Sequence, residues 1–303
     1  MNSSKPGHKS GYVAIVGRPN VGKSTLLNAM VGQKISIITH KAQTTRHRIL
    51  GIHSRPGAQI IFVDTPGFHL QQSRAINRYM NKTALSALHD VDIILFTLEA
   101  GHWTEEDRVL SEKLQGRTQP VIAVLNKVDT IPDKKQLLTE IERLSQLMKF
   151  DAIVPLSAHS GDGLDVLQSL ILERLPVSQP YFDSEQVTDR SLRFLAAEEI
   201  REKLFLHVHA ELPYALTVEI ESFIEEEKLY RIGGVIWVEK KSHKGMVIGK
   251  QGALLKRVGT QARQSLQKTF GKKIFLELWV KVKEGWSDDE RALQSLGYHD
   301  TSQ

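Results

Sequence analysis

Residues 17–24 have the sequence GRPNVGKS, in which two spaced glycines precede a lysine and a serine. This spacing matches G-x-x-x-x-G-K-[ST], the phosphate-binding loop, whose backbone N–H groups surround phosphates at the start of a helix. Lys23 would neutralise the β and γ oxygens, and the Ser24 hydroxyl would coordinate Mg²⁺. We expect nucleotide contacts along the whole loop, from Gly17, Arg18, Pro19, Asn20, Val21, Gly22, Lys23, Ser24 and Thr25.

A second motif, Asp64-Thr65-Pro66-Gly67 (DTPG), directly follows an apolar run. The Asp64 carboxylate can hold Mg²⁺ through a water, and the Gly67 N–H can reach a γ-phosphate and respond to its loss. Alone, the D-x-x-G pattern is weak, because these residues are also common in ordinary turns. Its position after a strand of the same expected sheet favours nucleotide binding, with Phe68 as its neighbour in the site.

The motif Asn126-Lys127-Val128-Asp129 (NKVD) has the residue types that recognise guanine. Guanine presents N1–H and N2–H₂ side by side, so one carboxylate accepts from both, whereas adenine would leave Asp129 unpaired. Sites of this kind discriminate by factors of about 10⁴ or more. The Lys127 stem can cover the base, and Ser157 and Ala158 can complete the pocket with an N–H toward guanine O6. Together the motifs predict GTP binding.

These motifs can meet only if the segments before them are strands of one sheet. Short, nearly continuous apolar runs indicate strands with helices on both faces, at residues 12–16, 59–63, 91–98, 121–125 and 153–156. Amphipathic segments alternate with these runs, at residues 25–31, 76–88, 105–114, 135–148 and 164–175. This alternation predicts an α/β domain with a doubly wound, mostly parallel sheet.

The alternation stops near Pro176, where a proline-containing polar segment indicates a linker. The order then changes to a helix at 191–207, strands at 216–223 and 229–238, a helix at 252–270 and a strand at 274–282. Such an order is typical of a separate α+β domain. We therefore expect domains at residues 1–176 and 191–303, joined by a linker at 177–190.

Within the second domain, Gly249-Lys250-Gln251-Gly252 (GKQG) fits the GXXG loop of KH domains, of the prokaryotic type II. Two glycines let the backbone approach nucleic-acid phosphates, and Lys250 adds charge. A lone GxxG is usually an ordinary turn, but here a long helix follows, with an apolar stripe at i+4 spacing. The expected RNA contacts are Lys244, Ile248, Gly249, Lys250, Gln251, Gly252, Lys256 and Arg257.

Charge supports this division of the chain. The 303 residues carry a net charge of only +5, which by itself indicates no partner. Residues 235–285, however, contain ten Lys and two Arg against three Glu, a net +9 that leaves −4 for the remainder. This cluster favours an RNA-binding face, with a merely solvated basic face as the alternative.

The composition also excludes several classes of function. The chain has no cysteine, which rules out disulfides, thiolate zinc sites and cysteine nucleophiles. No apolar run approaches the ~18 residues that a membrane-spanning helix needs. The first residues carry basic side chains with no apolar stretch behind them, so we expect no signal peptide.

The four nucleotide motifs resemble those of TRAFAC-class, Ras-like GTPases, and residues 41–48 (KAQTTRHR) look like the switch I of the Era and tRNA-modification group. The resemblance implies that Thr45 binds Mg²⁺ when GTP is present, with Thr44 as the competing assignment. It implies catalytic roles for Lys23, Thr45, Gly67 and Asn20.

The chain departs from the Ras-like pattern at one position. Phe68 stands where many Ras-like GTPases carry the glutamine that orients the attacking water, so intrinsic hydrolysis should be slow. Asn20 matches the residue that binds K⁺ in related GTPases. It can equally be a turn residue that holds the shape of the phosphate loop.

A GTPase domain followed by a KH domain resembles the Era family of bacterial ribosome-associated GTPases over nearly the whole chain. The resemblance implies a monomeric GTP switch, with GTP/GDP, Mg²⁺ and K⁺ as ligands and no DNA partner. It implies binding near the 3′ end of 16S ribosomal RNA and a role in rRNA processing and small (30S) subunit biogenesis. A cytoplasmic location with peripheral contact to the inner membrane is also implied.

Two other functions stay open from the sequence. One is a constitutive RNA-binding scaffold whose nucleotide pocket is only structural, an alternative that Phe68 keeps open. The other is a GTPase that acts on transfer RNA, which GKQG and the absence of cysteine disfavour. In the switch hypothesis, GTP orders the segments around Thr45 and Gly67 and thereby controls RNA binding.

Overall fold

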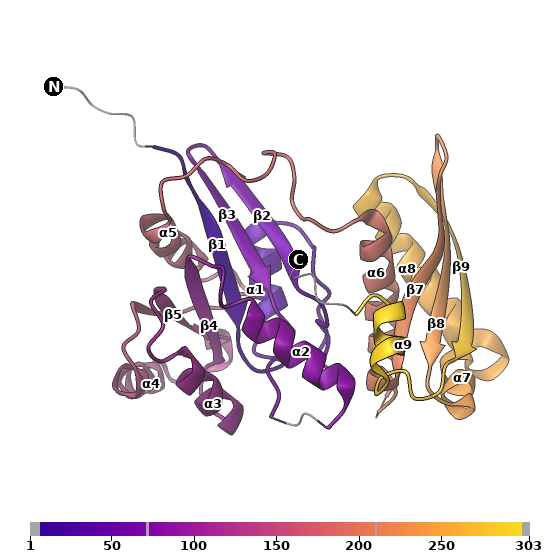
Figure 1. The fold of residues 1–303 in the computed structure, drawn as a ribbon, viewed down its shortest axis with the longest axis horizontal. Helices are drawn as coiled ribbons and strands as arrows, with labels where there is room; N and C mark the ends of the chain where they lie inside the picture. Colours follow the sequence, from indigo (N-terminus) through magenta and orange to yellow (C-terminus); the bar gives the residue numbers. More distant parts are fainter. Residues whose placement is uncertain (1–6, 71–72, 210, 299–303) are drawn as a thin grey trace. The chain divides into compact units, whose positions relative to one another are not determined.

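The computed structural model describes residues 7–70, 73–209 and 211–298 (Figure 1). The chain divides into two compact units. Of the described residues, the N-terminal unit comprises 7–36, 45–70 and 79–189, and the C-terminal unit comprises 37–44, 73–78, 190–209 and 211–298.

The N-terminal unit is built on a six-stranded sheet in the order β2-β3-β1-β4-β5-β6. Its strands are β1 (Lys9–Val16), β2 (Ile49–Arg55), β3 (Ala58–Asp64), β4 (Ile93–Glu99), β5 (Val121–Asn126) and β6 (Ala152–Pro155). All neighbours pair in parallel except β2, which pairs antiparallel with β3. The mostly parallel sheet is confirmed, and β2 is a strand that the sequence analysis missed.

Within the described residues, four α-helices lie between these strands in the chain, α1 (Lys23–Val31), α2 (Ala75–Ser86), α3 (Glu105–Leu114) and α4 (Lys134–Leu147), and α5 (Leu164–Arg174) follows β6. Helix α1 packs against α5 and against β1, β2 and β3. Buried leucines of α3 and α4 form another core with β1, β4 and β5. Because parallel strands end at the same edge, the loops after β1, β3, β5 and β6 gather there.

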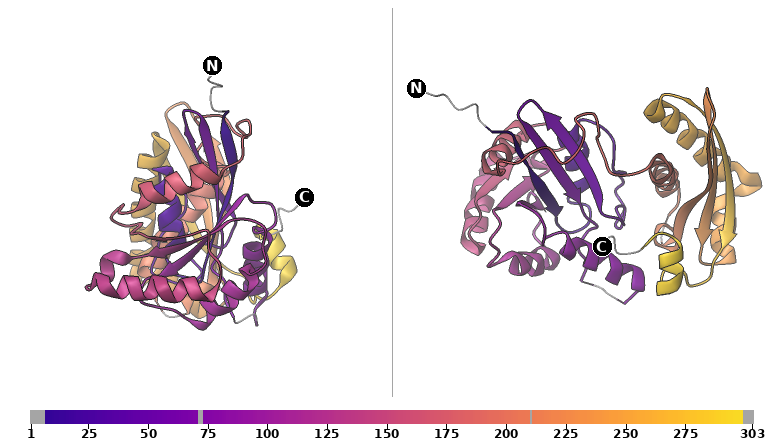
Figure 2. Two further views of the ribbon diagram at one scale, coloured as in Figure 1. Left: turned by 90° about the vertical axis from the view of Figure 1, so that its left-hand side faces the viewer. Right: turned by 45° about the horizontal axis from the view of Figure 1, so that its top comes forward.

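The C-terminal unit contains a three-stranded sheet in the order β7-β8-β9, formed by Leu216–Glu225, Leu229–Val238 and Lys273–Val282. Its helices are α6 (Leu192–His207), α7 (Lys241–Ile248), α8 (Ala253–Phe270) and α9 (Glu290–Ser295). Helices α6 and α8 lie side by side against the sheet (Figure 2). Val258, Ala262 and Leu266 of α8 are buried, as the i+4 spacing predicts. The α+β order and the KH topology are therefore confirmed.

The segment expected to be a linker lies along the N-terminal sheet. The Gln59 side-chain oxygen accepts from the N–H groups of Tyr181 and Phe182, at 2.8 and 3.0 Å. The Ile52 N–H of β2 donates to the Val187 carbonyl at 2.8 Å. Residues 177–189 of this segment therefore belong to the compact N-terminal unit.

Candidate nucleotide site and RNA interface

The predicted phosphate loop connects β1 to α1 and approaches other backbone closely. A Cβ on Gly17 would lie 2.3 Å from the Thr97 carbonyl oxygen of β4. Gly22 has a φ of 96°, and a Cβ there would lie 2.3 Å from the Asn126 side-chain nitrogen. Gly22 also provides no side-chain cap for α1, so N–H groups at the helix start can bind an anion.

Lys23 lies buried inside this loop. Its ammonium donates to the carbonyl oxygens of Gly17 and Arg18, at 2.9 and 2.8 Å. Burial lowers the pKa of Lys23 to about 8, and the nearby Asp64 carboxylate partly opposes this effect. The loop thus holds a cation among its own carbonyl groups, next to the helix start, which is an arrangement suited to phosphate.

Three oxygen-bearing side chains converge beside the phosphate loop. Asp64, fully buried at the end of β3, accepts a hydrogen bond from the Ser24 hydroxyl at 2.8 Å. Ser24 Oγ lies 2.7 Å from Thr45 Oγ1, so all three predicted Mg²⁺ ligands are neighbours. Burial raises the pKa of Asp64, against the opposing effects of Lys23 and the serine hydroxyls.

This cluster fits a hard cation. One carboxylate oxygen of Asp64, Oδ1, is buried and has no partner among the described residues. Carboxylate and hydroxyl oxygens are the ligand types that Mg²⁺ prefers. The residue that sequence analysis missed here is Ser36, whose buried hydroxyl donates to Asp64 Oδ2 at 2.9 Å. No motif signals Ser36, because it lies between the phosphate loop and the segment that resembles switch I.

The two threonines that compete for the Mg²⁺ role have different surroundings. Thr45 is buried and contacts Ser24. The Thr44 hydroxyl instead lies 2.6 Å from the Thr39 hydroxyl and 2.6 Å from the Lys41 carbonyl oxygen. These contacts favour Thr45 over Thr44 as the ligand.

The DTPG segment packs directly on the phosphate loop. A Cβ on Gly67 would lie 2.8 Å from the Pro19 backbone, and the Thr65 hydroxyl donates to the Ile15 carbonyl at 2.8 Å. The Phe68 N–H donates to the Gly17 carbonyl at 3.2 Å, while the Phe68 ring is buried in the core shared by β1, β4 and α3. The phenyl ring therefore has a structural role, and it cannot orient an attacking water as a glutamine at this position would.

His69 follows and is fixed through its backbone. Its N–H donates to the Asn81 side-chain oxygen at 3.0 Å, and its carbonyl accepts from Asn81 Nδ2 at 2.6 Å. Burial lowers the pKa of His69 to about 4, and the positive charge of Lys23 adds to this. The imidazole is therefore neutral at pH 7.

The NKVD loop begins with a buried asparagine that contacts two other loops. Asn126 donates to the Val21 carbonyl at 2.8 Å and accepts from the Ala158 N–H at 2.9 Å. Asp129 lies exposed in a short 3₁₀ turn at Val128–Thr130, where its carboxylate is accessible to a base. The structure thus brings together the phosphate, NKVD and Ser157-Ala158 segments.

The remaining loop residues lie around this core of the site. Val21 is buried, Pro19 and Thr25 are half-buried, and Asn20 is exposed with a φ of 65°. The Arg18 guanidinium bonds Glu99 and Asp107, at 2.9 and 3.1 Å. Arg18 thus contributes its backbone to the loop and directs its side chain to two carboxylates, Glu99 at the end of β4 and Asp107 in the first turn of α3.

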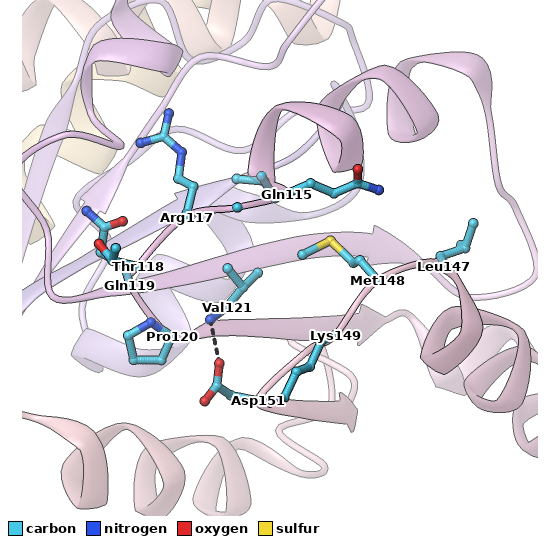
Figure 3. A pocket seen from close by; sticks show the side chains of 12 residues that line it. Gln115, Arg117, Thr118, Gln119, Pro120, Val121, Leu147, Met148, Lys149 and Asp151 are labelled. Carbon is cyan, nitrogen blue, oxygen red and sulfur yellow. Dashed lines mark hydrogen bonds between the residues drawn. The ribbon is translucent and has the colours of Figure 1, made fainter.

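One pocket of the same unit lies at the other end of the strands. It has a volume of about 590 Å³ and is lined by residues 114–121, 147–149 and 151 (Figure 3). The pocket borders Val121, where β5 starts, whereas Asn126 of the NKVD motif ends β5. Ligands of open parallel sheets bind at the carboxyl ends of the strands, so this pocket is separate from the nucleotide site.

The GKQG loop joins α7 to α8 in the C-terminal unit. Three of its residues have positive φ: Gly249 (73°), Gln251 (51°) and Gly252 (78°). A Cβ on Gly249 would lie 2.8 Å from Leu254 Cβ, whereas one on Gly252 would meet no atom within 4 Å. Open space above Gly252 leaves its backbone accessible to another molecule.

The side chains around this loop are cationic and exposed. Lys250 and Gln251 are exposed within it, Lys256 and Arg257 are exposed on the first turns of α8, and Lys244 is exposed on α7. Ile248 is partly buried and packs against the core. Gly252 provides no side-chain cap for α8, so N–H groups at its start face the same loop.

The N-terminal unit has the fold and loops of a P-loop GTPase, and the C-terminal unit has those of a type II KH domain. Comparison with known families agrees: residues 12–127 match the family described as 50S ribosome-binding GTPase, and residues 211–287 match the KH domain family.

Whole-chain comparisons extend this match. GTPase Era of Yersinia pestis (strain Pestoides F) and that of Yersinia pseudotuberculosis (serotype O:1b, strain IP 31758) are each 52% identical over 291 residues, which is 96% of both chains compared. A crystal structure of Era in complex with MgGDPNP and nucleotides 1506–1542 of 16S ribosomal RNA is 40% identical and superposes with a TM-score of 0.94. That match covers 97% of this chain and 100% of the other.

A second solved structure, a point variant of Aquifex aeolicus Era bound to GDP·AlF₄⁻, is also 40% identical, with a TM-score of 0.93 over 96% of this chain and 100% of that one. The identity and the coverage settle the relationship. The chain belongs to the Era family of GTPases.

Proposed function

We propose that this GTPase is a nucleotide-controlled RNA-binding switch. Its RNA would be the 3′ end of 16S ribosomal RNA, and its role would lie in rRNA processing and small-subunit biogenesis. The proposal rests on the exposed GKQG loop, which lies at the start of α8, where no side chain caps the helix, and beside three exposed lysines. The same chain also contains a complete phosphate site. The related Era crystallised with 16S ribosomal RNA nucleotides supports this choice of RNA.

In the nucleotide site, Asp129 would accept from the guanine N1–H and N2–H₂ groups, and Lys127 would cover the base. Lys23 and the N–H groups of the phosphate loop would hold the phosphates. Ser24, Thr45 and Asp64 would hold Mg²⁺, Asp64 through a water. When bound, Mg²⁺ neutralises charge on the β- and γ-phosphate oxygens.

Hydrolysis requires a group that orients water or stabilises charge, and Phe68 supplies neither. Asn20 is the candidate to hold a K⁺ ion at the phosphates. Its exposed side chain is compatible with that role, and its φ of 65° is equally compatible with a turn residue. We therefore expect slow intrinsic hydrolysis that K⁺ accelerates.

In the RNA interface, the Gly249 and Gly252 backbone would lie against nucleotide phosphates, with Ile248 and Gln251 beside the bases. Lys244, Lys250, Lys256 and Arg257 would neutralise phosphate charge. Binding should therefore weaken steeply with salt, because each neutralised phosphate of a single strand contributes a slope of about −0.7 in log affinity against log salt.

Location and assembly follow from the same resemblance. We propose a monomer in the cytoplasm, with peripheral contact to the inner membrane and no DNA partner. Within residues 7–70, 73–209 and 211–298, no helix is both long and apolar enough to cross a membrane. Co-sedimentation with vesicles of anionic and of neutral lipids would test the peripheral contact.

Two measurements distinguish the switch from its alternatives. Crosslinking the protein to total RNA and mapping the bound position should yield the 3′ end of 16S ribosomal RNA; recovery of transfer RNA would favour a GTPase that acts on transfer RNA. GTP turnover is measured in K⁺ and in Na⁺, with and without this RNA. It should be faster in K⁺ than in Na⁺, and faster with the RNA than without it. A constitutive scaffold would show stimulation by neither.

A further inference from the structure

Three charged side chains connect the phosphate loop to the NKVD loop, and we call them the Glu99 bridge: Arg18, Glu99 and Lys127. Glu99 is the last residue of β4 and uses both carboxylate oxygens. Its Oε2 accepts from Arg18 Nη2 at 2.9 Å, and its Oε1 accepts from Lys127 Nζ at 2.9 Å. One carboxylate thus pairs with a cation from each of two nucleotide-site loops.

The two cations depend on Glu99 to different degrees. Arg18 also bonds Asp107 at 3.1 Å and the His102 carbonyl at 3.2 Å, so it keeps partners if Glu99 is removed. For Lys127, Glu99 is the one hydrogen-bond partner of the ammonium within the described part of the chain. Loss of Glu99 should therefore release the Lys127 side chain and leave the Arg18 side chain held.

Glu99 is suited to remain charged in this position. Its side chain is 25% exposed, against 10% for Arg18 and 32% for Lys127. Burial raises the pKa of Glu99, but hydrogen bonds from Lys127 and Arg18 outweigh it and bring the pKa below its ordinary value. The Glu99 carboxylate is therefore ionised at neutral pH, in a partly desolvated setting where hydrogen bonds to a charged group are strong.

The Lys127 backbone is itself fixed. Lys127 has a φ of 65°, which a non-glycine residue adopts only when its surroundings require it. The backbone and the ammonium are thus both held, which restricts the methylene stem between them. A free lysine side chain would lose rotamer entropy when it is ordered against a ligand, and a side chain already held at both ends avoids part of this cost.

We propose that Glu99 is a positioning residue for the guanine base. By anchoring the Lys127 ammonium, it holds the lysine stem in place before nucleotide arrives, and so increases the affinity for GDP and GTP alike. It takes no part in the chemistry at the γ-phosphate. The inference rests on the proposed role of Asn126–Asp129 as the base-binding loop.

The test is a double-mutant cycle that joins Glu99→Gln to Lys127→Met, which keeps most of the stem and removes the charge. Dissociation constants for GDP and a non-hydrolysable GTP analogue are measured by competition with a fluorescent guanine nucleotide. Glu99→Gln should raise the dissociation constants of GDP and of the GTP analogue by about tenfold. The hydrolysis rate at saturating GTP should stay within about twofold of the original. In a protein that already carries Lys127→Met, adding Glu99→Gln should raise each dissociation constant by less than about twofold.

Glu112→Gln is the matched control, because Glu112 pairs with Arg108 in an exposed ion pair of the same unit. It should leave both dissociation constants unchanged. If Glu99→Gln does not fold, as judged by its melting without nucleotide, Glu99→Asp enters the same cycle, since it keeps the charge on a shorter side chain.

Two results would overturn the proposal. If Glu99→Gln lowered nucleotide affinity equally with and without Lys127→Met, Glu99 would not act through Lys127. A fall in the saturated hydrolysis rate with unchanged affinities would place Glu99 in the phosphate chemistry. Failure of the underlying base assignment is recognised separately, because Lys127→Met alone would then leave guanine affinity unchanged.

Discussion

Asn126 donates from its side-chain amide to the carbonyl of Val21, 105 residues earlier in the chain, at 2.8 Å. The same amide accepts from the Ala158 N–H at 2.9 Å. Both bonds are buried, where an unsatisfied partner would cost about 1–3 kcal/mol. One side chain thus fixes the phosphate loop, the NKVD loop and the Ser157-Ala158 segment relative to one another, as a site for one nucleotide requires.

Substitution of Asp129 should change which base is bound. Asp129→Asn replaces a double acceptor with a group that donates and accepts, which matches xanthine, with its carbonyl at position 2. The affinity for GTP should fall by at least about 100-fold and that for xanthosine triphosphate should rise. Competition binding with both nucleotides measures this, and an unchanged preference for guanine would refute the role of Asp129.

Substitution of Gly252 should remove RNA binding and leave nucleotide hydrolysis in place. Gly252→Asp adds bulk and negative charge where a Cβ meets open space and where RNA phosphates are expected. RNA affinity should fall by at least about 100-fold, because a phosphate contact is replaced by repulsion. A filter-binding titration alongside a GTPase assay gives both readouts.

Gly271→Asp is the control for this variant. Gly271 ends α8 with a φ of 67° and, like Gly252, has no atom near a would-be Cβ, so both substitutions carry a similar backbone cost of about 1 kcal/mol. Equal losses of RNA binding in the two variants would argue against a specific role for the GKQG loop.

Substitution of Asn20 should separate its two proposed roles. Asn20→Gly removes the side-chain amide but adopts the φ of 65° at least as easily. If the amide binds K⁺, the ratio of GTP turnover in K⁺ to that in Na⁺ should fall to about one, with GDP affinity retained. Persistence of the K⁺ stimulation would leave Asn20 as a turn residue only.

His69 should make the fold sensitive to acid. Its pKa lies near 4 in the folded protein, below the ordinary value of 6.5, because burial disfavours the charged ring. As the pH falls through this interval, the unfolded chain binds a proton that the folded chain does not. The contribution of neutral His69 to the free energy of unfolding is therefore fully present above pH 6.5. It decreases by about 1.4 kcal/mol per pH unit as the pH falls toward 4.

The His69→Gln variant lacks this titration and keeps a polar side chain. The free energy of unfolding of both proteins is measured with guanidinium at pH 7 and pH 5. Between these pH values it should fall by about 2 kcal/mol more for the original protein than for the variant. Equal losses would mean that the imidazole is protonated as easily in the fold as in water.

Much of the fold could be predicted because apolar runs mark buried parallel strands without reference to their partners. Strand β2 was missed because its residues follow the basic segment that resembles switch I and end in the polar sequence His53-Ser54-Arg55. The turn signal at Pro56-Gly57 could have identified the hairpin, since Gly57 has a φ of 79°.

The site was predictable where a motif encodes backbone geometry, as in the phosphate loop and GKQG. Ser36 and Glu99 were not found, because each acts on a residue distant in sequence: Ser36 on Asp64, and Glu99 on Arg18 and Lys127. Glu99 does carry one usable signal, since it is a charged residue at the carboxyl end of an apolar run. Ser36 carries none.

If bound nucleotide controls RNA binding, the affinity for an RNA of the 16S 3′ end should depend on which nucleotide is bound. The dissociation constant is measured by fluorescence anisotropy with saturating GDP and with a non-hydrolysable GTP analogue, in the same K⁺ and Mg²⁺ buffer. We expect the RNA to bind at least about tenfold more tightly with the GTP analogue than with GDP. Equal affinity in the two nucleotide states would contradict it.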